Sequence, residues 1–232
     1  MDTPLVRDLS HGSGFGKGYD YPPSLPERVG QRVGAIAKRI AQRGLRAALG
    51  TIGRMDAASH PLHPHAALTP ATFRPRRILV IRTDLLGDVV MTLPTIAALQ
   101  QAYPEAEIDL VVLPSVAPLV RGQPGITRVI ACDPNGWATE MLTRAGRQRV
   151  SATLRELRAA HYDLAISVCG EVASILARLA GAPRRVGFAD EAYAHFLTDP
   201  VPGRRFALGL HEVAYGLRLA ERAGASALPV DD

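Results

Sequence analysis

Two carboxylates, Asp84 and Asp88, lie close to a basic residue in the short segment RTDLLGD, residues 82–88. A carboxylate can act as a general base when a substrate hydroxyl is held against it, because positioning adds to intrinsic basicity. Asp88 is our candidate for this base. It is also a candidate helix cap, since a carboxylate at a helix N-terminus accepts backbone N–H groups and is favoured by the helix dipole. The sequence leaves both roles open.

Three neighbours of these carboxylates are candidate ligand-binding residues. Arg82 and Thr83 could bind an anionic group of a substrate, because the planar guanidinium fork matches carboxylate and phosphate. Gly87 would let a ligand or another backbone segment approach closely. The segment lacks the glycine spacing of a dinucleotide fingerprint and of a P-loop, so we do not expect it to clamp a nucleotide phosphate.

The segment lies between a β-branched run and an apolar helix, at the point where open parallel sheets bind their ligands. Strand-like and helical runs alternate from residue 76 onward. The expected strands are 78–81, 108–113, 128–131, 164–168 and 185–188, and the expected helices are 89–102, 115–121, 139–160, 172–180 and 208–223. This alternation predicts an α/β, Rossmann-like domain with a parallel sheet covered by helices on both faces.

A second basic group, Arg144, Arg147 and Arg149, opens the long helix after the third strand. A solvated helix face is one interpretation of charges at this spacing. The loops after the first and third strands of a parallel sheet can also share one edge, which would place these arginines across a cleft from Asp88. An anionic substrate that carries hydroxyl groups would suit both groups of residues.

The N-terminal third of the chain differs from the rest in composition. Residues 1–26 are rich in Gly, Ser and Pro, and we predict that they are disordered. Residues 27–54 have apolar positions at helical spacing with arginines between them, which predicts a basic amphipathic helix. Such a helix can lie on an anionic membrane or pack on the domain, and the sequence favours neither. Residues 55–75 are the expected linker, and residues 76–226 the expected domain.

Composition excludes several classes of protein. The excess of positive charge lies in residues 1–75, and aromatic residues make up only 5% of the chain, so a nucleic-acid reader is not expected. The sequence has neither a secretory signal nor an apolar run long enough to span a bilayer, and we expect a cytoplasmic protein. Cys132 and Cys169 are expected to be buried free thiols. We expect no metal site, because the prolines between His60, His63 and His65 prevent a shared helical face.

Taken together, these residues resemble the N-terminal domain of the heptosyltransferase family, glycosyltransferase family 9. The resemblance begins with ILVIRTDLLGDVVMTLPTIAALQQAYPEAEIDLVV and continues through HYDLAISV, LARLAGAPRRVGF and HEVAYGLRLAERAG. It covers about residues 76–226, with the motifs in the family's order.

The resemblance implies the N-terminal half of a GT-B fold, in which this domain holds the acceptor and a C-terminal domain holds the nucleotide-sugar donor. It implies inverting transfer of heptose from an ADP-sugar to a lipid-linked saccharide of lipopolysaccharide, without a bound metal. Asp88 falls on the family's general base, Arg82 and Thr83 fall near the acceptor, and Arg144 and Arg147 lie where basic residues bind acceptor anions.

Residues 227–232 would then begin the linker to a missing donor domain, which would bind the ADP-heptose-like donor. We expect no transferase activity from residues 1–232 alone. The rival interpretation is a non-catalytic module that binds a sugar or a partner at the inner face of the membrane, anchored by residues 27–54. A Rossmann enzyme with a nucleotide cofactor is disfavoured by the absence of the glycine fingerprint.

Overall fold

The computed structural model describes residues 68–168, 170–191, 193–203 and 209–226. The chain divides into two units, Met1–Ile40 and Ala41–Asp232, and every described residue belongs to the second unit. The predictions for residues 1–26, 27–54 and 227–232 lie outside the described residues. Among those described, no helix is long and apolar enough to cross a membrane.

The domain is built on a six-stranded sheet with the order β3-β2-β1-β4-β5-β6. Every neighbouring pair of strands is parallel. The strands are β1 (Arg77–Ile81), β2 (Glu107–Val112), β3 (Arg128–Ala131), β4 (Leu164–Ser167), β5 (Arg184–Phe188) and β6 (Asp199–Val201). The predicted α/β class with a parallel sheet is confirmed.

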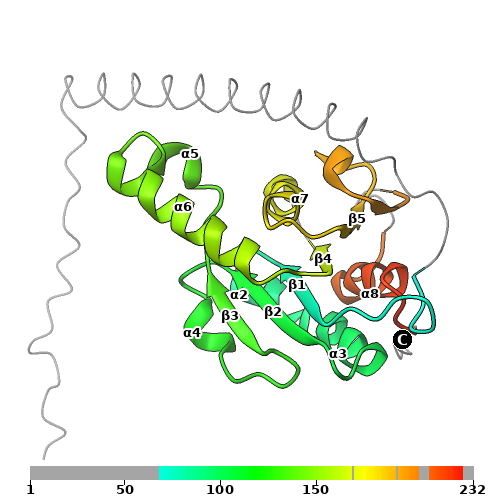
Figure 1. Cartoon of the computed structure of the whole chain (residues 1–232). Helices are drawn as coiled ribbons and strands as arrows, with labels where there is room; N and C mark the ends of the chain where they lie inside the picture. The colour runs from blue at the N-terminus through cyan, green and yellow to red at the C-terminus, as the bar shows by residue number, and fades with distance from the viewer. Residues whose placement is uncertain (1–67, 169, 192, 204–208, 227–232) are drawn as a thin grey trace, which may run out of the picture. The chain divides into compact units, whose positions relative to one another are not determined.

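Helices cover both faces of the sheet, with α6 and α7 on one side and α3 and α8 on the other (Figure 1). Their bounds are α2 (Leu86–Val90), α3 (Leu93–Ala102), α4 (Ala117–Val120), α5 (Trp137–Glu140), α6 (Arg144–Ala159), α7 (Gly170–Leu179) and α8 (Glu212–Arg222), with a 3-10 turn at Ala194–Phe196. Helices in such βαβ units run antiparallel to the strands, so their N-termini lie at the carboxyl edge of the sheet.

The two faces of the sheet follow from the alternation of side chains along each strand. In β1, Ile78 and Val80 pack with α3 and α8, whereas Leu79 and Ile81 pack with α6 and α7. All four side chains are fully buried. A strand that is buried on both faces is apolar at every position, and a continuous apolar run in the sequence therefore indicates such a strand.

Two of the expected helices are broken in the structure. The run 89–102 divides into α2 and α3, and α3 begins where Pro94 stands in its first turn, a position that proline favours. The run 139–160 divides into α5 and α6, because the extended residue Thr143 caps α6 by accepting a hydrogen bond from the Gly146 amide at 3.0 Å.

Two short segments carried no clear sequence signal. Strand β6 is only three residues long and contains Pro200, which is tolerated at a sheet edge. Residues 68–75, the described part of the expected linker, pack on the domain. Leu68 is buried in the core, and the ring of Phe73 meets that of Tyr103 edge to face at 6.2 Å between centroids.

Candidate active site

Arg82 is the first residue beyond β1, and its amide donates a hydrogen bond to the Val111 carbonyl at 2.9 Å. The alternation of β1 turns its side chain to the same face as Val80, toward α3 and α8. Arg82 is only 1% exposed. A buried guanidinium needs anionic partners, because moving an unpaired charge out of water is costly.

Three carboxylates supply those partners. Arg82 Nε lies 3.1 Å from Asp84 Oδ2, Arg82 Nη2 lies 3.1 Å from Asp88 Oδ1, and Arg82 Nη1 lies 2.9 Å from Glu212 Oε1. Each guanidinium nitrogen therefore faces a different carboxylate. Within the described part of the chain, the Nε and Nη2 groups lack a hydrogen bond of good geometry, so their contacts with the two aspartates are ion pairs rather than aligned hydrogen bonds.

Asp88 lies inside helix α2, not before it, and it is the acidic residue of the first turn. The N-cap of α2 is Leu85, which makes no side-chain cap hydrogen bond. The carboxylate of Asp88 instead contacts Arg82, and its side chain is 38% exposed. The Asp88 carboxylate is thus held by the buried Arg82 and is also accessible to solvent. A general base needs such access to reach a substrate hydroxyl.

The residues next to Asp88 leave room for a ligand. A Cβ added at Gly87 would meet no atom within 4 Å, so the packing of the domain does not require glycine there. Thr83 is 7% exposed and lies beside Arg82 in the same turn. The candidate residues Arg82, Thr83, Gly87 and Asp88 all lie in the segment that directly follows β1.

Large apolar side chains surround this turn on its outer surface. Leu85 is 74% exposed and Val90 is 49% exposed, and Leu86 and Met91 are also exposed. Exposed apolar side chains that cluster beside a polar site are typical of surfaces that bind another molecule. This surface suits a ligand with both polar and apolar parts.

The predicted arginines of α6 are exposed and lie apart from the turn. Arg147 Nη1 donates a hydrogen bond to the Met141 carbonyl at 3.0 Å, and Arg149 pairs with Glu140 at 3.1 Å. Among the described residues, neither Arg144 nor Arg147 forms an ion pair or hydrogen bond with the turn 82–88. They start a helix that follows β3, so they lie on the same edge of the sheet as Asp88.

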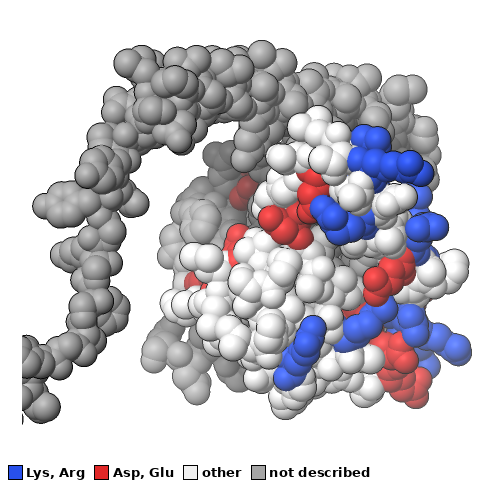
Figure 2. Space-filling model, turned by 90° about the vertical axis from the view of Figure 1, so that its left-hand side faces the viewer, with Lys and Arg blue, Asp and Glu red and all other residues white. Residues whose placement is uncertain are grey.

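Charged side chains are unevenly spread on the side of the molecule that carries α5 and α4. Basic and acidic side chains together border a broad uncharged area on this side (Figure 2). Met141 and Leu142, between α5 and α6, are exposed apolar side chains.

Glu212 is the member of the site that the sequence analysis missed. It stands in the first turn of α8, where the N-cap His211 accepts a hydrogen bond from the Val213 amide at 3.3 Å. The predicted helix 208–223 began too early to reveal this position. One pattern could have indicated Glu212: an acidic residue in the first turn of a helix that follows a parallel strand lies near the carboxyl edge of the sheet.

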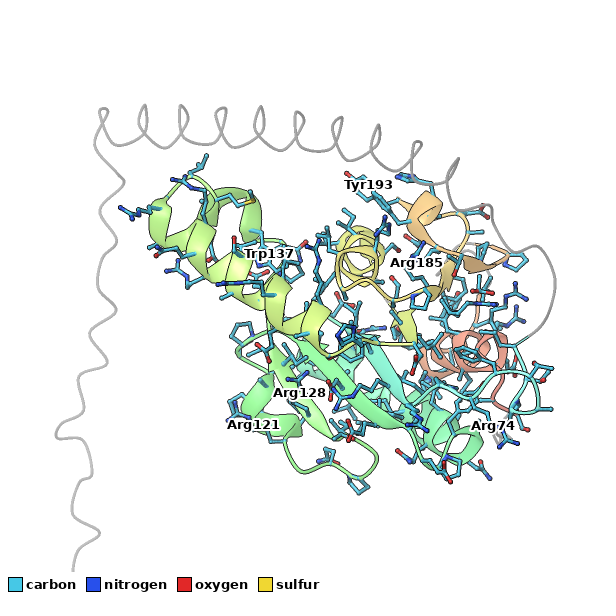
Figure 3. The ribbon with its side chains drawn as sticks, in the orientation of Figure 1. Arg74, Arg121, Arg128, Trp137, Arg185 and Tyr193 are labelled. Carbon is cyan, nitrogen blue, oxygen red and sulfur yellow. The ribbon has the colours of Figure 1, made fainter. Side chains whose placement is uncertain are left out.

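A second charged cluster lies at the opposite, amino edge of the sheet. Asp109 accepts hydrogen bonds from Arg128 at 2.8 Å and from the Tyr162 hydroxyl at 2.6 Å. Burial, followed by the bond to Asp109, raises the pKa of Tyr162, and the bond to Asp109 raises that of Arg128. Figure 3 shows Arg128 at the other end of the sheet from Trp137, which follows β3. In this cluster the side chains of β2 and β3 are paired with each other and with the hydroxyl of Tyr162, which lies just before β4.

Two further expectations from the sequence concern Cys132 and metal-ligating residues. Cys132 is buried, as predicted, and burial raises its pKa to about 12, so the reactive thiolate is scarce at neutral pH. Cys169 lies outside the described residues. The part of the chain that the structure describes contains no group of three His, Cys, Asp or Glu residues that could hold a metal ion.

The sequence is similar to those of known heptosyltransferases over part of its length. No protein-family model matches the chain. The chain is 31% identical to lipopolysaccharide heptosyltransferase 1 of Escherichia coli K12 over 106 residues. This aligned segment is 45% of this chain and 33% of the relative. Over 147 residues the chain is 27% identical to the enzyme of the same name from Pseudomonas aeruginosa, which covers 63% of this chain and 40% of the relative. The chain thus spans well under half the length of these relatives.

Solved structures of heptosyltransferases and of a family 9 glycosyl transferase have a similar fold. The E. coli heptosyltransferase WaaC with ADP-2-deoxy-2-fluoro heptose superposes with a TM-score of 0.57 and 23% identity, over 67% of this chain and 50% of that chain. The glycosyl transferase family 9 structure from Veillonella parvula superposes with a TM-score of 0.53 and 23% identity, over 65% of this chain and 42% of that chain. At this identity the likeness establishes the fold.

Proposed function

We propose that this chain, whose fold is that of the glycosyltransferase family 9 heptosyltransferases, is the acceptor domain of an inverting glycosyltransferase. The observation that carries the proposal is the Asp88 carboxylate, 38% exposed at the carboxyl edge of the sheet and 3.1 Å from the buried Arg82. The acceptor would be a lipid-linked saccharide of lipopolysaccharide, since the curated relatives are named as lipopolysaccharide heptosyltransferases.

The chemistry assigned to Asp88 is general-base catalysis. Its carboxylate takes the proton of an acceptor hydroxyl as the oxygen forms a bond to the anomeric carbon of the donor sugar. The bond from that carbon to the nucleotide phosphate breaks, and the nucleoside diphosphate leaves with the electron pair. Attack from the side opposite the leaving group inverts the anomeric centre.

The other predicted residues take roles that fit their positions. Arg82 is enclosed by three carboxylates, so it would orient Asp88 rather than bind an anionic acceptor group directly. Thr83 and Gly87 would border the acceptor hydroxyl. The exposed Arg144 and Arg147 would pair with acceptor phosphates or carboxylates, for which the guanidinium fork is suited.

The donor would be an ADP-heptose-like nucleotide sugar bound by a second domain. Structures of the similar E. coli protein contain ADP or ADP-2-deoxy-2-fluoro heptose. The turn 82–88 has no nucleotide fingerprint, which supports an acceptor role for the domain described here. No metal is assigned to the reaction.

The test separates binding from transfer. Calorimetric titration of this chain with heptose-deficient lipopolysaccharide should give saturable binding, which Asp88→Asn should preserve. The gene product at its natural length should transfer heptose from ADP-heptose to the same acceptor, and Asp88→Asn should lower kcat by at least about 100-fold. The matched control is Glu221→Gln, a change at an exposed glutamate of α8. Full activity of Asp88→Asn would refute the role of Asp88 as base.

The rival function is a non-catalytic module held at the inner face of the membrane. The observation in its favour is the basic amphipathic pattern of residues 27–54, which lie outside the described residues. Flotation with vesicles of phosphatidylglycerol and phosphatidylethanolamine should be strong for the whole chain and weak after deletion of residues 27–54. Equal flotation of the two proteins would remove the membrane role from that segment.

A further inference from the structure

We propose that Glu212 is a positioning residue that acts on Asp88 through Arg82. The inference rests on the proposed function, in which Asp88 is the base, and it adds a residue from the far end of the domain sequence. Glu212 contacts Nη1 of the guanidinium, whereas the two aspartates face Nε and Nη2. It therefore controls where that guanidinium, and with it the Asp88 carboxylate, is held.

Glu212 differs from the two aspartates in distance and in burial. It is the nearest carboxylate to Arg82, at 2.9 Å against 3.1 Å for both Asp84 and Asp88. Its side chain is 14% exposed, whereas those of Asp84 and Asp88 are 34% and 38% exposed. An ion pair shielded from water is screened less than an exposed one, so the Glu212 contact is the strongest anchor of the guanidinium.

The backbone that carries Glu212 is itself fixed by packing. Tyr215, one turn further along α8, is buried, and its ring meets that of Phe188 edge to face at 5.8 Å between centroids. Its hydroxyl accepts a hydrogen bond from the Leu210 amide at 3.3 Å. Gly216 lies so close to Thr95 of α3 that an added Cβ would collide with the threonine side chain. Helix α8 cannot shift without disturbing this packing.

The planar guanidinium makes this anchor relevant to Asp88. Its three nitrogens are rigidly linked, so fixing Nη1 against Glu212 also fixes the direction in which Nη2 faces Asp88. The contact at Nη2 lacks hydrogen-bond alignment among the described residues, so Asp88 alone would hold the guanidinium poorly. A shift of about 1 Å at a catalytic group can cost on the order of 100-fold in rate.

The experiment compares Glu212→Ala, Glu212→Gln and the control Glu221→Gln in the natural-length gene product. Glu212→Ala should lower kcat by about 10- to 100-fold with KM for the acceptor nearly unchanged. Glu212→Gln, which keeps an oxygen acceptor, should restore part of that loss. The double variant of Glu212→Ala with Asp88→Asn should be no slower than Asp88→Asn alone, because both changes act on one step.

The outcomes separate this inference from the proposed function. Normal kcat in Glu212→Ala, with Asp88→Asn inactive, would overturn the positioning role alone. A double variant slower than Asp88→Asn by the full factor of Glu212→Ala would also overturn it, because the two residues would then act independently. Full activity of Asp88→Asn, or no transfer by the wild-type gene product, would overturn the proposed function and this inference together. Solvent exchange of the Arg82 guanidinium N–H signals, measured by NMR on residues 1–232, should speed up in Glu212→Ala.

Discussion

Arg82 Nη2 lies 3.1 Å from Asp88 Oδ1, and the cation of this pair is 1% exposed while the anion is 38% exposed. The pair thus spans the boundary between the core and the surface.

Replacement of Arg82 by methionine would leave three carboxylates without their shared cation. Two of these carboxylates are more than a third exposed and keep contact with water, so we expect Arg82→Met to destabilise the domain by about 1–3 kcal/mol, measured by urea unfolding. Arg155→Met, at an exposed arginine of α6, should change stability little.

Gly87 offers a test that separates ligand contact from folding. An added Cβ there meets no atom within 4 Å, and alanine in α2 costs less than glycine by up to about 1 kcal/mol. Gly87→Ala should therefore keep or raise the unfolding free energy while weakening acceptor binding in calorimetry. Gly146→Ala is the contrasting variant, because its Cβ would collide with the Glu140 carbonyl, and it should destabilise the fold. Unchanged acceptor affinity in Gly87→Ala would exclude close approach of the ligand at this position.

The fold was largely predictable because the strands are buried on both faces. The strand residues 78–81 and 128–131 are apolar apart from Arg128. Arg128 is paired with Asp109 of the neighbouring strand. The helix boundaries were less predictable, since the break before Leu93 depends on Pro94 and the break before Arg144 depends on a tight turn. Strand β6 was missed because its three residues depend on pairing with β5.

The candidate site was predictable only where it is local in sequence. Asp88 and Arg82 fall in one turn, and the strand-to-helix pattern places them at the ligand-binding edge. Glu212 reaches the site through the packing of α8 on α3, which no local pattern encodes. The burial of Arg82 was also hidden, because a sequence does not tell whether an arginine binds a ligand or its own carboxylates.

Arg144 and Arg147 should contribute to the affinity for an anionic acceptor without contributing to stability. Both are exposed at the start of α6. The double variant with glutamine at both positions should weaken binding of heptose-deficient lipopolysaccharide by about 10-fold or more and should show a weaker salt dependence. Arg155→Gln on the same helix is the matched control. Equal affinity of wild type and double variant would assign the acceptor anions to other residues.

The hydroxyl of Tyr162 should contribute to stability at the amino edge of the sheet. It donates a 2.6 Å hydrogen bond to Asp109, which is buried in β2. Tyr162→Phe removes this bond and leaves Asp109 with Arg128 alone, so we expect a loss of about 1–2 kcal/mol in chemical unfolding. Acceptor binding should not change, because this cluster is at the edge of the sheet opposite to Asp88.

Cys132 should make the domain less stable in alkaline solution. Burial raises its pKa from 9.0 to about 12, so the unfolded chain loses the thiol proton at a lower pH than the folded chain. The free energy of unfolding is unaffected by ionisation of this thiol below about pH 9. Between about pH 9 and about pH 12 it falls by up to about 1.4 kcal/mol per pH unit. Urea unfolding at about pH 8 and about pH 10 should show a smaller decrease in Cys132→Ala than in wild type.

The packing of α8 also has a consequence for biosynthesis. Glu212 belongs to the final helix of the described domain, so a ribosome-bound chain has made β1 and both aspartates long before the third carboxylate emerges. Until then Arg82 cannot be enclosed as it is in the folded protein. Completion of the candidate site therefore coincides with completion of the domain, and a nascent chain released before α8 would lack the Glu212 contact that completes the enclosure of Arg82.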